Sequence, residues 1–309
     1  MKSIILMATY NGEKYLHEQF HSINGQTFNE WDLIVSDDHS SDATNQIISN
    51  FKKFSPNNIR YEKGPGEGFV HNFFHLVSLA PKTYDLFFFS DQDDVWINSR
   101  MQEVIALFKD TQKHNLSKVP TIYFSNTVLI NQAGIKIKDF KKNLFPSFSN
   151  ALIESAGSGN TMVLNKEAFA ILKSSLEQIT LDKIVSHDWW AYQVITGSNG
   201  TVIYDKKCLV QYRQHSNNVH GSNALIMGKL GRLISILKKE FSLMLDKQLS
   251  ELIKIDTLTQ ENRALLLEYQ SLRKQYRIKL MIFSIQNGIQ RSKILENIAY
   301  YLAIFLKRS

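Results

Sequence analysis

Hydrophobic residues follow two different periods along the first two thirds of the chain. Short apolar runs of strand length alternate with segments in which apolar residues recur every three or four positions, as on one face of a helix. The run Leu86-Phe87-Phe88-Phe89 is apolar at successive positions, which is typical of a central parallel strand buried on both faces. The predicted strands span residues 3–8, 31–36, 59–62, 85–90, 121–130, 161–164, 201–204 and 208–213.

Helices are predicted between these strands and throughout the C-terminal part of the chain. The earlier ones cover residues 14–25, 42–54, 68–80, 166–176 and 188–196. Residues 136–149 are expected to form a basic, aromatic loop. No proline follows Pro146, and from residue 224 onward the pattern predicts helices over 224–246, 247–278 and 279–307.

This alternation of strands and helices predicts an α/β fold with a mostly parallel, twisted sheet and helices on both of its faces. The C-terminal helices form an extension of that fold. We therefore expect one domain over residues 1–221 and a separate helical region over residues 222–309.

Polar residues cluster directly after three of the predicted strands. Thr9-Tyr10-Asn11 follow the first strand, Asp37-Asp38 the second and Asp91-Gln92-Asp93-Asp94 the fourth. Ligands of open α/β sheets bind beyond the carboxyl ends of the strands, so these segments are the first candidates for a binding site.

Three carboxylates within four residues provide the sharpest chemical signal. Asp91, Asp93 and Asp94 would repel one another at a water-poor sheet edge, and a bound divalent cation would remove that repulsion. Oxygen-only ligands favour Mg²⁺ or Mn²⁺ over softer metals. The alternative is a solvated acidic turn that caps the helix near Asn98.

Other polar segments allow both a functional and a structural interpretation. The carboxylates at 37 and 38 can accept a base N–H or a ribose hydroxyl, or simply cap the next helix. Asp188 lies near a helix N-terminus, where it can merely complement the helix dipole. Trp189 and Trp190 offer a stacking surface for a sugar or a base.

Residues 212–220 bring together hydrogen-bond donors and two histidines after a strand. Arg213 can neutralise phosphate charge, and one histidine can complete a metal site, although a lone histidine is more often structural. The glycine-rich segment 64–68 lacks the G-x-G-x-x-G spacing, and the chain has no Gly-Lys-Ser/Thr sequence. Nicotinamide-binding and P-loop functions are therefore disfavoured.

Composition sets further limits. A chain of 309 residues with 43% hydrophobic and 21% charged residues can bury a large core in about two domains. Its single cysteine, Cys208, excludes an intrachain disulfide and a cysteine-cluster metal site. The apolar run 4–8 is too short for a signal peptide, and we expect no transmembrane helix.

Charge is distributed unevenly along the chain. Residues 1–221 carry 21 Lys and Arg against 22 Asp and Glu, whereas residues 222–309 carry 15 against 7. A uniformly basic nucleic-acid-binding protein is therefore disfavoured. Basic residues also flank apolar helical segments within 271–309, which predicts either an interfacial membrane helix or a helical pair that packs on the rest of the chain or on a second copy. As an anchor, this region would be dispensable for the activity of the first domain in solution.

Five ordered segments together resemble the inverting glycosyltransferases of family 2, which have the GT-A fold. The resemblance covers roughly residues 1–220. It is carried by the segments 8–12, 35–42, 89–96, 186–190 and 212–219, which read ATYNG, VSDDHSSD, FSDQDDVW, SHDWW and YRQHSNNV. The fuller strings are similar to the bacterial rhamnosyltransferase subgroup.

The resemblance implies a role for each matching residue. Binding of the donor nucleotide would fall to Thr9, Tyr10, Asn11, Asp38, Asp91 and Arg213, with the Asp38 carboxylate on the pyrimidine and the Asp91 carboxylate on the ribose or the sugar. Metal contacts would come from Asp93 and His215, the general base would be Asp188, and the acceptor would contact Trp189 and Trp190. The sequence departs from the family pattern at Ala8 and at His39, which stands where the family usually has glycine. Residues 157–161 match the acceptor loop of the family only loosely.

The implied activity is a metal-dependent, inverting transfer of a sugar with Mn²⁺ or Mg²⁺ as cofactor. The subgroup indicates L-rhamnose from dTDP-rhamnose, with UDP-hexoses as alternative donors, and a saccharide acceptor linked to a lipid in cell-envelope polysaccharide synthesis. The expected location is cytoplasmic, at the inner face of the membrane, with a possible homodimer through the C-terminal helices. The alternatives are a nucleotide-sugar hydrolase or nucleotidyltransferase, and a catalytically silent scaffold.

Overall fold

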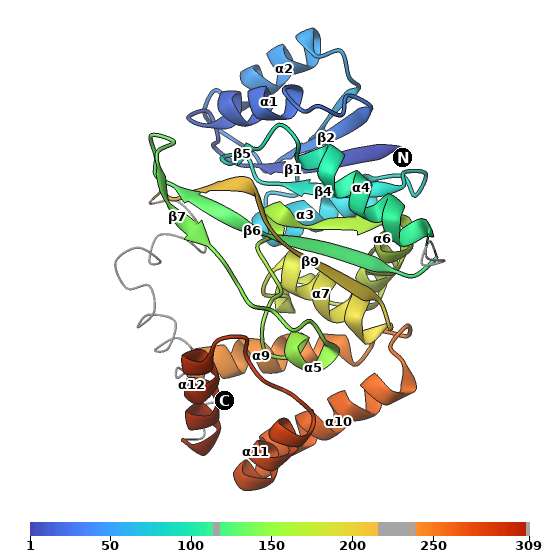
Figure 1. Cartoon of the computed structure of the whole chain (residues 1–309), viewed down its shortest axis with the longest axis vertical. Coiled ribbons are helices and arrows are strands. Elements are labelled where there is room, and N and C mark those ends of the chain that lie inside the picture. Colours follow the sequence, from blue (N-terminus) through green and yellow to red (C-terminus); the bar gives the residue numbers. More distant parts are fainter. Residues whose placement is uncertain (114–117, 216–235, 237–238, 307–309) are drawn as a thin grey trace. The chain divides into compact units, whose positions relative to one another are not determined.

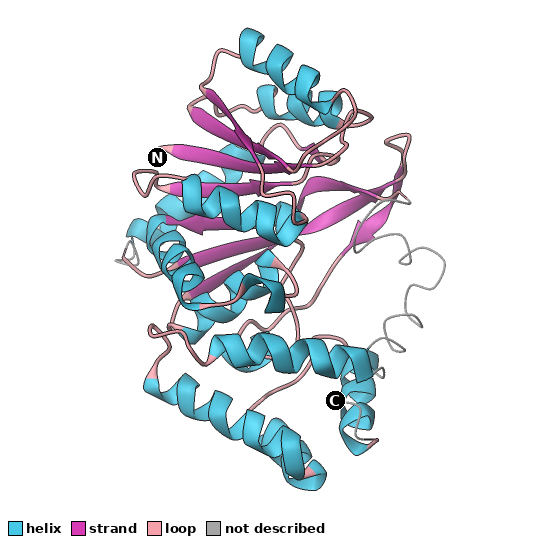
Figure 2. Cartoon of the chain, turned by 180° about the vertical axis from the view of Figure 1, so that it is seen from behind, coloured by secondary structure: helices cyan, strands magenta, loops and turns pink. Residues whose placement is uncertain are grey.

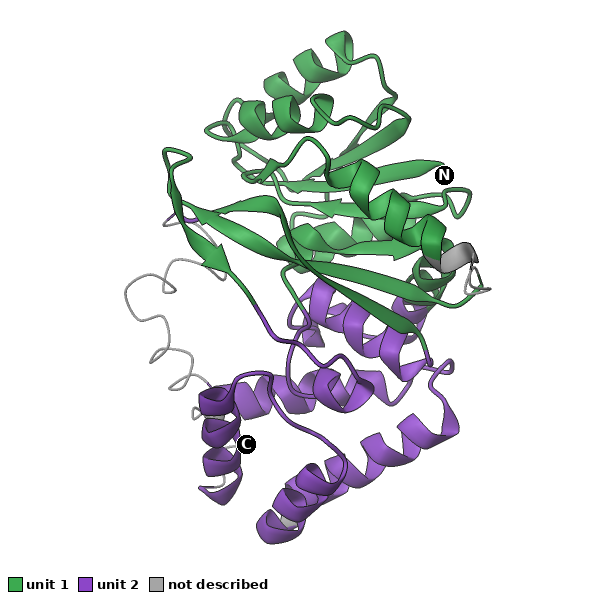
Figure 3. Cartoon of the chain, viewed as in Figure 1, with its two compact units in different colours: residues 1–141, 157–174, 200–213 green, residues 142–156, 175–199, 214–309 purple. Residues whose placement is uncertain are grey.

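The computed structural model describes residues 1–113, 118–215, 236 and 239–306, which belong to two compact units. The first unit comprises residues 1–141, 157–174 and 200–213, and the second comprises residues 142–156, 175–199 and 214–309 (Figure 3). The chain therefore passes between the units several times. The predicted boundary between residues 221 and 222 lies outside the described residues.

The first unit is built on one mixed sheet, in which nine strands pair among the described residues (Figure 1). The order along the sheet is β3-β2-β1-β4-β8-β6-β9-β5, and β7 pairs with β6. Strands β1, β2, β3 and β4 run parallel, as predicted, and β6 is parallel to β9. The strand bounds are β1 Ser3–Thr9, β2 Trp31–Asp37, β3 Ile59–Lys63, β4 Leu86–Ser90, β5 Val95–Trp96, β6 Thr121–Ile130, β7 Lys136–Phe140, β8 Val163–Asn165 and β9 Thr201–Arg213.

Helices cover both faces of this sheet because successive side chains of its central strands point to opposite sides. Phe88 belongs to a core shared with α1, α2 and α4, whereas Phe87 stacks on Phe169 of α6 at 3.6 Å between ring centroids. Helix α3 packs against β1 and β2. The predicted α/β fold with helices on both faces is thus confirmed. The bounds are α1 Leu16–Asn24, α2 Thr44–Phe54, α3 Phe69–Leu79, α4 Arg100–Lys113 and α6 Lys166–Ser175.

Three features of the sheet differ from the sequence-based expectation. The first is β5, a short strand paired with β9 that the hydrophobic pattern does not predict. The predicted loop 136–149 is wrong over β7, which forms an antiparallel hairpin with β6. Its exposed, charged side chains hide the strand pattern, and the turn before it depends on Gly134, whose φ is 76°. The two strands predicted over 201–213 are one strand, in which residues 206 and 207 are extra between the Asp205–Ser125 and Cys208–Asn126 pairs.

The second unit consists of helices and their connections in its described part (Figure 2). The predicted helix breaks at 246/247 and 278/279 are wrong, because both positions lie inside helices. Helix α10 instead begins after Thr259, whose side chain accepts a hydrogen bond from the Asn262 amide, and Gly288 follows α11 with a φ of 64°. The bounds are α5 Phe148–Ala151, α7 His187–Gly197, α9 Lys239–Leu252, α10 Gln260–Gln275, α11 Arg277–Gln286 and α12 Ile294–Phe305, with short 3-10 turns at Gly159–Thr161 in the first unit and at Leu176–Gln178 and Leu181–Lys183.

Buried aromatic and leucine side chains form the interior of the second unit. Trp190 and Tyr192 of α7 are fully buried, as are Leu249 of α9 and Leu266 of α10. None of the helices in the described ranges is long and apolar enough to span a membrane. The start of the first predicted C-terminal helix, residues 224–235, lies outside the described residues.

Candidate functional site

The ends of β1 and β2 are joined by the carboxylate of Asp37. Its Oδ1 accepts hydrogen bonds from Thr9 Oγ1 at 2.9 Å and from Ser40 Oγ at 2.6 Å, and its Oδ2 accepts from the Ser40 amide at 3.0 Å. Asn11, with a φ of 46°, completes the junction because its Oδ1 accepts from the Ser41 amide. The Thr9 hydroxyl is therefore occupied within the scaffold, while the Tyr10 side chain beside it is 59% exposed.

The carboxylate of Asp38 holds the glycine-rich loop that follows β3. Its two oxygens accept hydrogen bonds from the amides of Gly66, at 2.6 Å, and Gly68, at 2.8 Å. Both glycines have positive φ values, 77° and 93°, which L side chains rarely adopt. The glycine-rich loop 64–68 thus directs these two amides at a carboxylate of its own chain. Each Asp38 oxygen retains a second lone pair, so this contact leaves a nucleobase N–H able to bind there.

His39 occupies the position where the family pattern has glycine. Its φ of 65° is the left-handed conformation that glycine adopts most easily, so the turn keeps its shape despite the substitution. The ring lies 3.1 Å, through Nε2, from the carbonyl oxygen of Gly64, which compensates part of the backbone cost. The departure at His39 is therefore accommodated locally.

Residues 91–94 form a loop after β4. Hydrogen bonds from α1, from Tyr10 after β1, from Asn160 and from Arg213 at the end of β9 hold this loop in place. Gln19 of α1 donates to the Asp91 carbonyl, and the Gln92 amide group exchanges two hydrogen bonds of 2.8 Å with the backbone of Tyr10. The close approach of this amide requires glycine at 12, where a Cβ would lie 2.3 Å from Gln92 Oε1. The Asp91 and Asp93 side chains are half-buried, so the loop presents two carboxylates on a restrained backbone.

Arg213, at the end of β9, is a central support of this loop. Its Nε donates to the Asp93 carbonyl at 2.8 Å, its Nη2 pairs with Glu18, and its Nη1 donates to the carbonyls of Asn131 and Gln132 in the β6–β7 turn. The side chain is almost fully buried. Arg213 thus connects α1, the hairpin and the acidic loop, and its predicted contact with a donor phosphate stays a prediction.

The third carboxylate, Asp94, points into the protein. It is fully buried and accepts hydrogen bonds from the Arg213 amide and from Asn160 Nδ2. Burial raises the pKa of Asp94 well above its usual range, and the charges of Asp93 and Asp91 raise it further. Behind it, Arg100 donates to the Asn160 carbonyl and lies 3.8 Å from the Trp96 ring centroid, and burial lowers the pKa of Arg100 to about 9.

The acidic loop fits a divalent cation that also binds a ligand. Within the described ranges, no group of three or more His, Cys, Asp or Glu side chains forms a metal site. Mg²⁺ is commonly held by only one or two carboxylates together with substrate phosphates, so Asp93, with or without Asp91, is enough from this loop.

The remaining predicted site residues belong to the second unit. Asp188 lies in the first turn of α7 and accepts a 2.8 Å hydrogen bond from the Ser155 hydroxyl. The Trp189 and Trp190 rings are buried, and their N–H groups donate to the Ala151 carbonyl and the Ser175 hydroxyl. These indoles thus pack inside the unit, and their contact with an acceptor stays a prediction. The same holds for His215 as a metal ligand and for the approach of Asp188 to Asp93.

Sequence reasoning missed the amide side chains that organise the loops. Gln19 and Asn160 bond the acidic loop, and Gln92 bonds that loop to Tyr10. Asn72 of α3 donates to the Ser36 carbonyl of β2. Gln92, which lies between two aspartates, and Asn160, which lies in the segment 157–161, fall in motifs that the sequence singles out, whereas Gln19 and Asn72 carry no signal. The partners of these amides are up to 82 residues away, so no local pattern identifies them.

Solved structures define the class of protein to which this fold belongs. The structure of TarS residues 1–349 from Staphylococcus aureus, in complex with UDP-GlcNAc, aligns with 100% of this chain and 82% of its own at a TM-score of 0.60 and 17% identity. The mannosyltransferase PcManGT from Pyrobaculum calidifontis, in complex with GDP-Man and Mn²⁺, aligns with 99% and 86% at a TM-score of 0.57 and 14% identity. The fold is that of the GT-A glycosyltransferases.

Sequence comparison then assigns the family. The model described as glycosyl transferase family 2 matches residues 4–179. The dTDP-rhamnosyl transferase RfbG of Shigella flexneri is 32% identical over 232 residues, which are 74% of this chain and 78% of the relative. This chain belongs to glycosyl transferase family 2, and it is a glycosyltransferase.

The contacts of Arg213 predict a structural cost when it is replaced. Arg213→Met keeps much of the side-chain volume but removes every donor to Asp93, Glu18 and the hairpin, so the free energy of unfolding should fall by about 2–4 kcal/mol. Urea denaturation followed by circular dichroism measures this change. The exposed Arg60→Met is the control and should change little. If Arg213→Met kept full stability and lost only nucleotide affinity, the residue would be a phosphate ligand rather than a support.

Proposed function

We propose that this enzyme transfers L-rhamnose from dTDP-rhamnose, with inversion at the anomeric carbon, to a lipid-linked saccharide during synthesis of a cell-envelope polysaccharide. The observation that carries the proposal is the rigid acidic loop 91–94 beyond the carboxyl end of β4, in a family 2 chain that is 32% identical to a dTDP-rhamnosyl transferase. A carboxylate of this loop can hold a divalent cation, and that cation would neutralise the negative charge of the donor's diphosphate.

In this mechanism the donor nucleotide binds along the ends of β1, β2 and β4. The exposed Tyr10 side chain stacks on the base, and Asp38 accepts its N–H. Asp93 and His215 would hold the divalent cation, and Asp91 would contact the ribose or the sugar of the donor. Bound there, Mn²⁺ or Mg²⁺ supplies positive charge that stabilises the departing nucleoside diphosphate.

The base is assigned to Asp188. Its carboxylate accepts the proton of the acceptor hydroxyl as that oxygen attacks the anomeric carbon. One base and one stabilised leaving group give a direct displacement, which inverts the configuration. A retaining reaction through a glycosyl-enzyme would instead need a second carboxylate close to the first, as in retaining hydrolases.

We further assign the membrane contact to the exposed faces of α11 and α12. Apolar side chains recur every three or four positions on both helices: Ile278, Ile282, Ile285, Ile294, Ile298, Leu302 and Phe305. Lys274, Arg277 and Lys279 are exposed beside the start of α11. Apolar residues flanked by cations suit an anionic lipid surface, where a lipid-linked acceptor would be found.

Donor binding should depend on the acidic loop. A thermal-shift series with dTDP, UDP and GDP should show stabilisation of about 2.7 kcal/mol by dTDP plus Mn²⁺ at 100 times its dissociation constant. Asp93→Asn should remove the Mn²⁺-dependent part, whereas Asp110→Asn, on the exposed side of α4, should not. Equal shifts for wild type and Asp93→Asn would contradict the assignment of the cation site.

The base assignment predicts a selective loss of chemistry. Asp188→Asn should lower the rate of transfer from dTDP-rhamnose by about 100-fold or more while dTDP still binds, because general bases contribute that much to rate. Asp182→Asn, an exposed carboxylate in the turn before α7, is the matched control. Near-normal turnover of Asp188→Asn would eliminate this residue as the base, and donor hydrolysis without a glycosylated product would favour a hydrolase.

Membrane binding can be tested by substitutions that leave the core intact. Ile298→Glu should weaken cosedimentation with phosphatidylglycerol vesicles by about tenfold or more, because it removes apolar burial and adds a like charge. Leu267→Glu on α10 is the control, since both side chains are 51% exposed. Unchanged vesicle binding together with dissociation of a dimer in sedimentation velocity would show that this face binds a second copy instead.

A further inference from the structure

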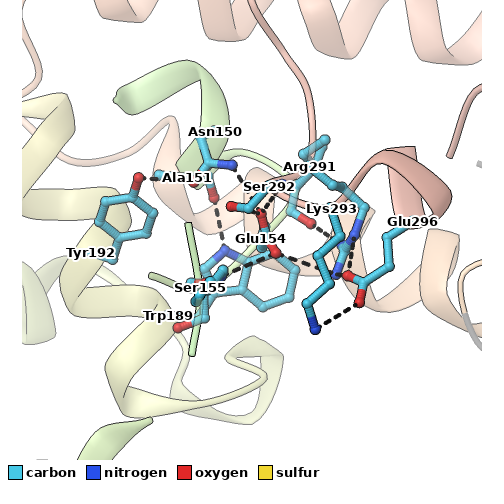
Figure 4. Close-up of polar contacts among 12 residues, drawn as sticks. Asn150, Ala151, Glu154, Ser155, Trp189, Tyr192, Arg291, Ser292, Lys293 and Glu296 are labelled. Atoms are coloured by element: carbon cyan, nitrogen blue, oxygen red, sulfur yellow. Dashed lines mark hydrogen bonds and ion pairs between the residues drawn. The ribbon is translucent and has the colours of Figure 1, made fainter. Parts of the chain in front are cut away.

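The segment 142–156 of the second unit bonds both the candidate base and the connection between α11 and α12. Figure 4 shows its residues Asn150, Glu154 and Ser155 beside Trp189 of α7 and beside Arg291 and Ser292. It includes the short helix α5 and lies against α7. Trp189 Nε1 and Gln193 Nε2 both donate to the Ala151 carbonyl, and the Tyr192 hydroxyl donates to the Ser147 carbonyl. The segment is therefore bonded to α7, the helix that carries Asp188, at several points.

A further contact of segment 142–156 reaches Asp188 itself. Ser155 Oγ donates to Asp188 Oδ2 at 2.8 Å. A carboxylate with one oxygen bonded in this way has fewer accessible rotamers, and its other oxygen keeps a defined direction. Ser155 is thus placed to orient a carboxylate without taking part in proton transfer.

Ser155 is in turn held by a buried cation. The Lys142 ammonium donates to the Ser155 carbonyl and pairs with Glu154 Oε1 at 3.0 Å. Burial lowers the pKa of Lys142 below its usual range, and the charge of Glu154 offsets that lowering only in part. The two oxygens of the serine therefore bond in two directions, the hydroxyl to Asp188 and the carbonyl to Lys142.

Glu154 receives two further hydrogen bonds from the connection between α11 and α12 and one from α5. Its Oε2 accepts from the Ser292 amide and from Ser292 Oγ, both at 2.8 Å, and from Asn150 Nδ2 at 3.0 Å. Burial alone would raise the pKa of Glu154, but the charges of Lys142 and Arg291 and these hydrogen bonds lower it to about 2. The carboxylate thus stays ionised at neutral pH, and Figure 4 shows it at the centre of the contacts.

Arg291 fastens the same connection to the segment and to α12. Its Nη1 donates to the Ile153 carbonyl at 2.6 Å, and its Nη2 pairs with Glu296 at 3.1 Å. In addition, Asn150 Nδ2 donates to the Gln290 carbonyl. Residues 290–296 therefore form hydrogen bonds with buried polar groups of segment 142–156, so this part of the C-terminal region packs as part of the second unit.

We propose that Ser155 is a positioning residue that orients Asp188 for proton abstraction, and that the Lys142–Glu154–Ser292 contacts anchor Ser155 to the C-terminal helices. The inference rests on the proposed role of Asp188 as the base. It also changes the expectation for the tail, because deleting residues 271–309 would strip Ser292 and Arg291 from the buried Glu154. Transfer to a soluble acceptor should then be lost even though no membrane is involved.

The first experiment separates positioning from stability. Ser155→Ala in the full chain should lower kcat for rhamnosyl transfer by about tenfold, because it removes a hydrogen bond to a charged group, while the KM for dTDP-rhamnose and the dTDP thermal shift stay unchanged. Ser155→Thr keeps the hydroxyl and should restore most of kcat. Ser149→Ala, the same change in α5 of the same segment, should behave as wild type.

The second experiment tests the anchor by a double-mutant cycle. Ser292→Ala removes one hydrogen bond to Glu154 and should lower kcat several-fold. If Ser292 acts through Ser155, the double variant should be no slower than Ser155→Ala alone, whereas independent effects would multiply. Multiplying effects, or an unchanged kcat in Ser292→Ala, would overturn the link to the C-terminal helices.

Wild type and Asp188→Asn measured in parallel distinguish the two possible failures. If wild type transfers rhamnose, Asp188→Asn does not, and Ser155→Ala keeps a normal kcat, then the positioning role is wrong and the proposed function stands. A wild-type enzyme that transfers no rhamnose, or an Asp188→Asn variant with normal turnover, overturns the proposed function or the base assignment. A loss in Ser155→Ala that the threonine variant fails to restore also overturns positioning by the hydroxyl.

Discussion

Three neighbouring carboxylates follow an apolar strand, and the first unit has to hold them close together against their mutual repulsion. Asp94 is turned inward and bonded by Asn160 and the Arg213 amide, which leaves Asp91 and Asp93 half-buried. The backbone between them is bonded by side chains from α1 and β9. A loop that carries this much like charge would otherwise relax away from the sheet, and the candidate donor site depends on its staying in place.

Both units use a buried cation in the same way. In the first unit Arg213 donates to the Asp93 carbonyl, and in the second Lys142 donates to the carbonyl of Ser155, whose hydroxyl bonds Asp188. Arg213 bonds the main chain of the candidate carboxylate itself and forms an ion pair with Glu18. Lys142 bonds the main chain of the serine that contacts Asp188 and forms an ion pair with Glu154.

Much of the fold followed from local patterns. The central strands were predictable because runs such as 86–89 must be buried on both faces, and the amphipathic helices between them because their apolar residues recur at helical spacing. The failures occurred where pairing or packing sets the structure. Strand β7 is charged and exposed, so only its partner β6 makes it a strand, and the breaks of the C-terminal helices depend on Thr259 and Gly288 rather than on hydrophobic period.

The amino-acid order alone was enough to identify the family and its candidate carboxylates, because the acidic and aromatic motifs are short and contiguous. It could not show that the Arg213 guanidinium lies buried behind the acidic loop, that Trp189 and Trp190 pack in a core, or that Ser292 bonds a glutamate 138 residues earlier. Those contacts join residues that share no local pattern. They exist because burying a charge or an amide requires a partner at hydrogen-bond distance, and folding brings that partner from a distant part of the chain.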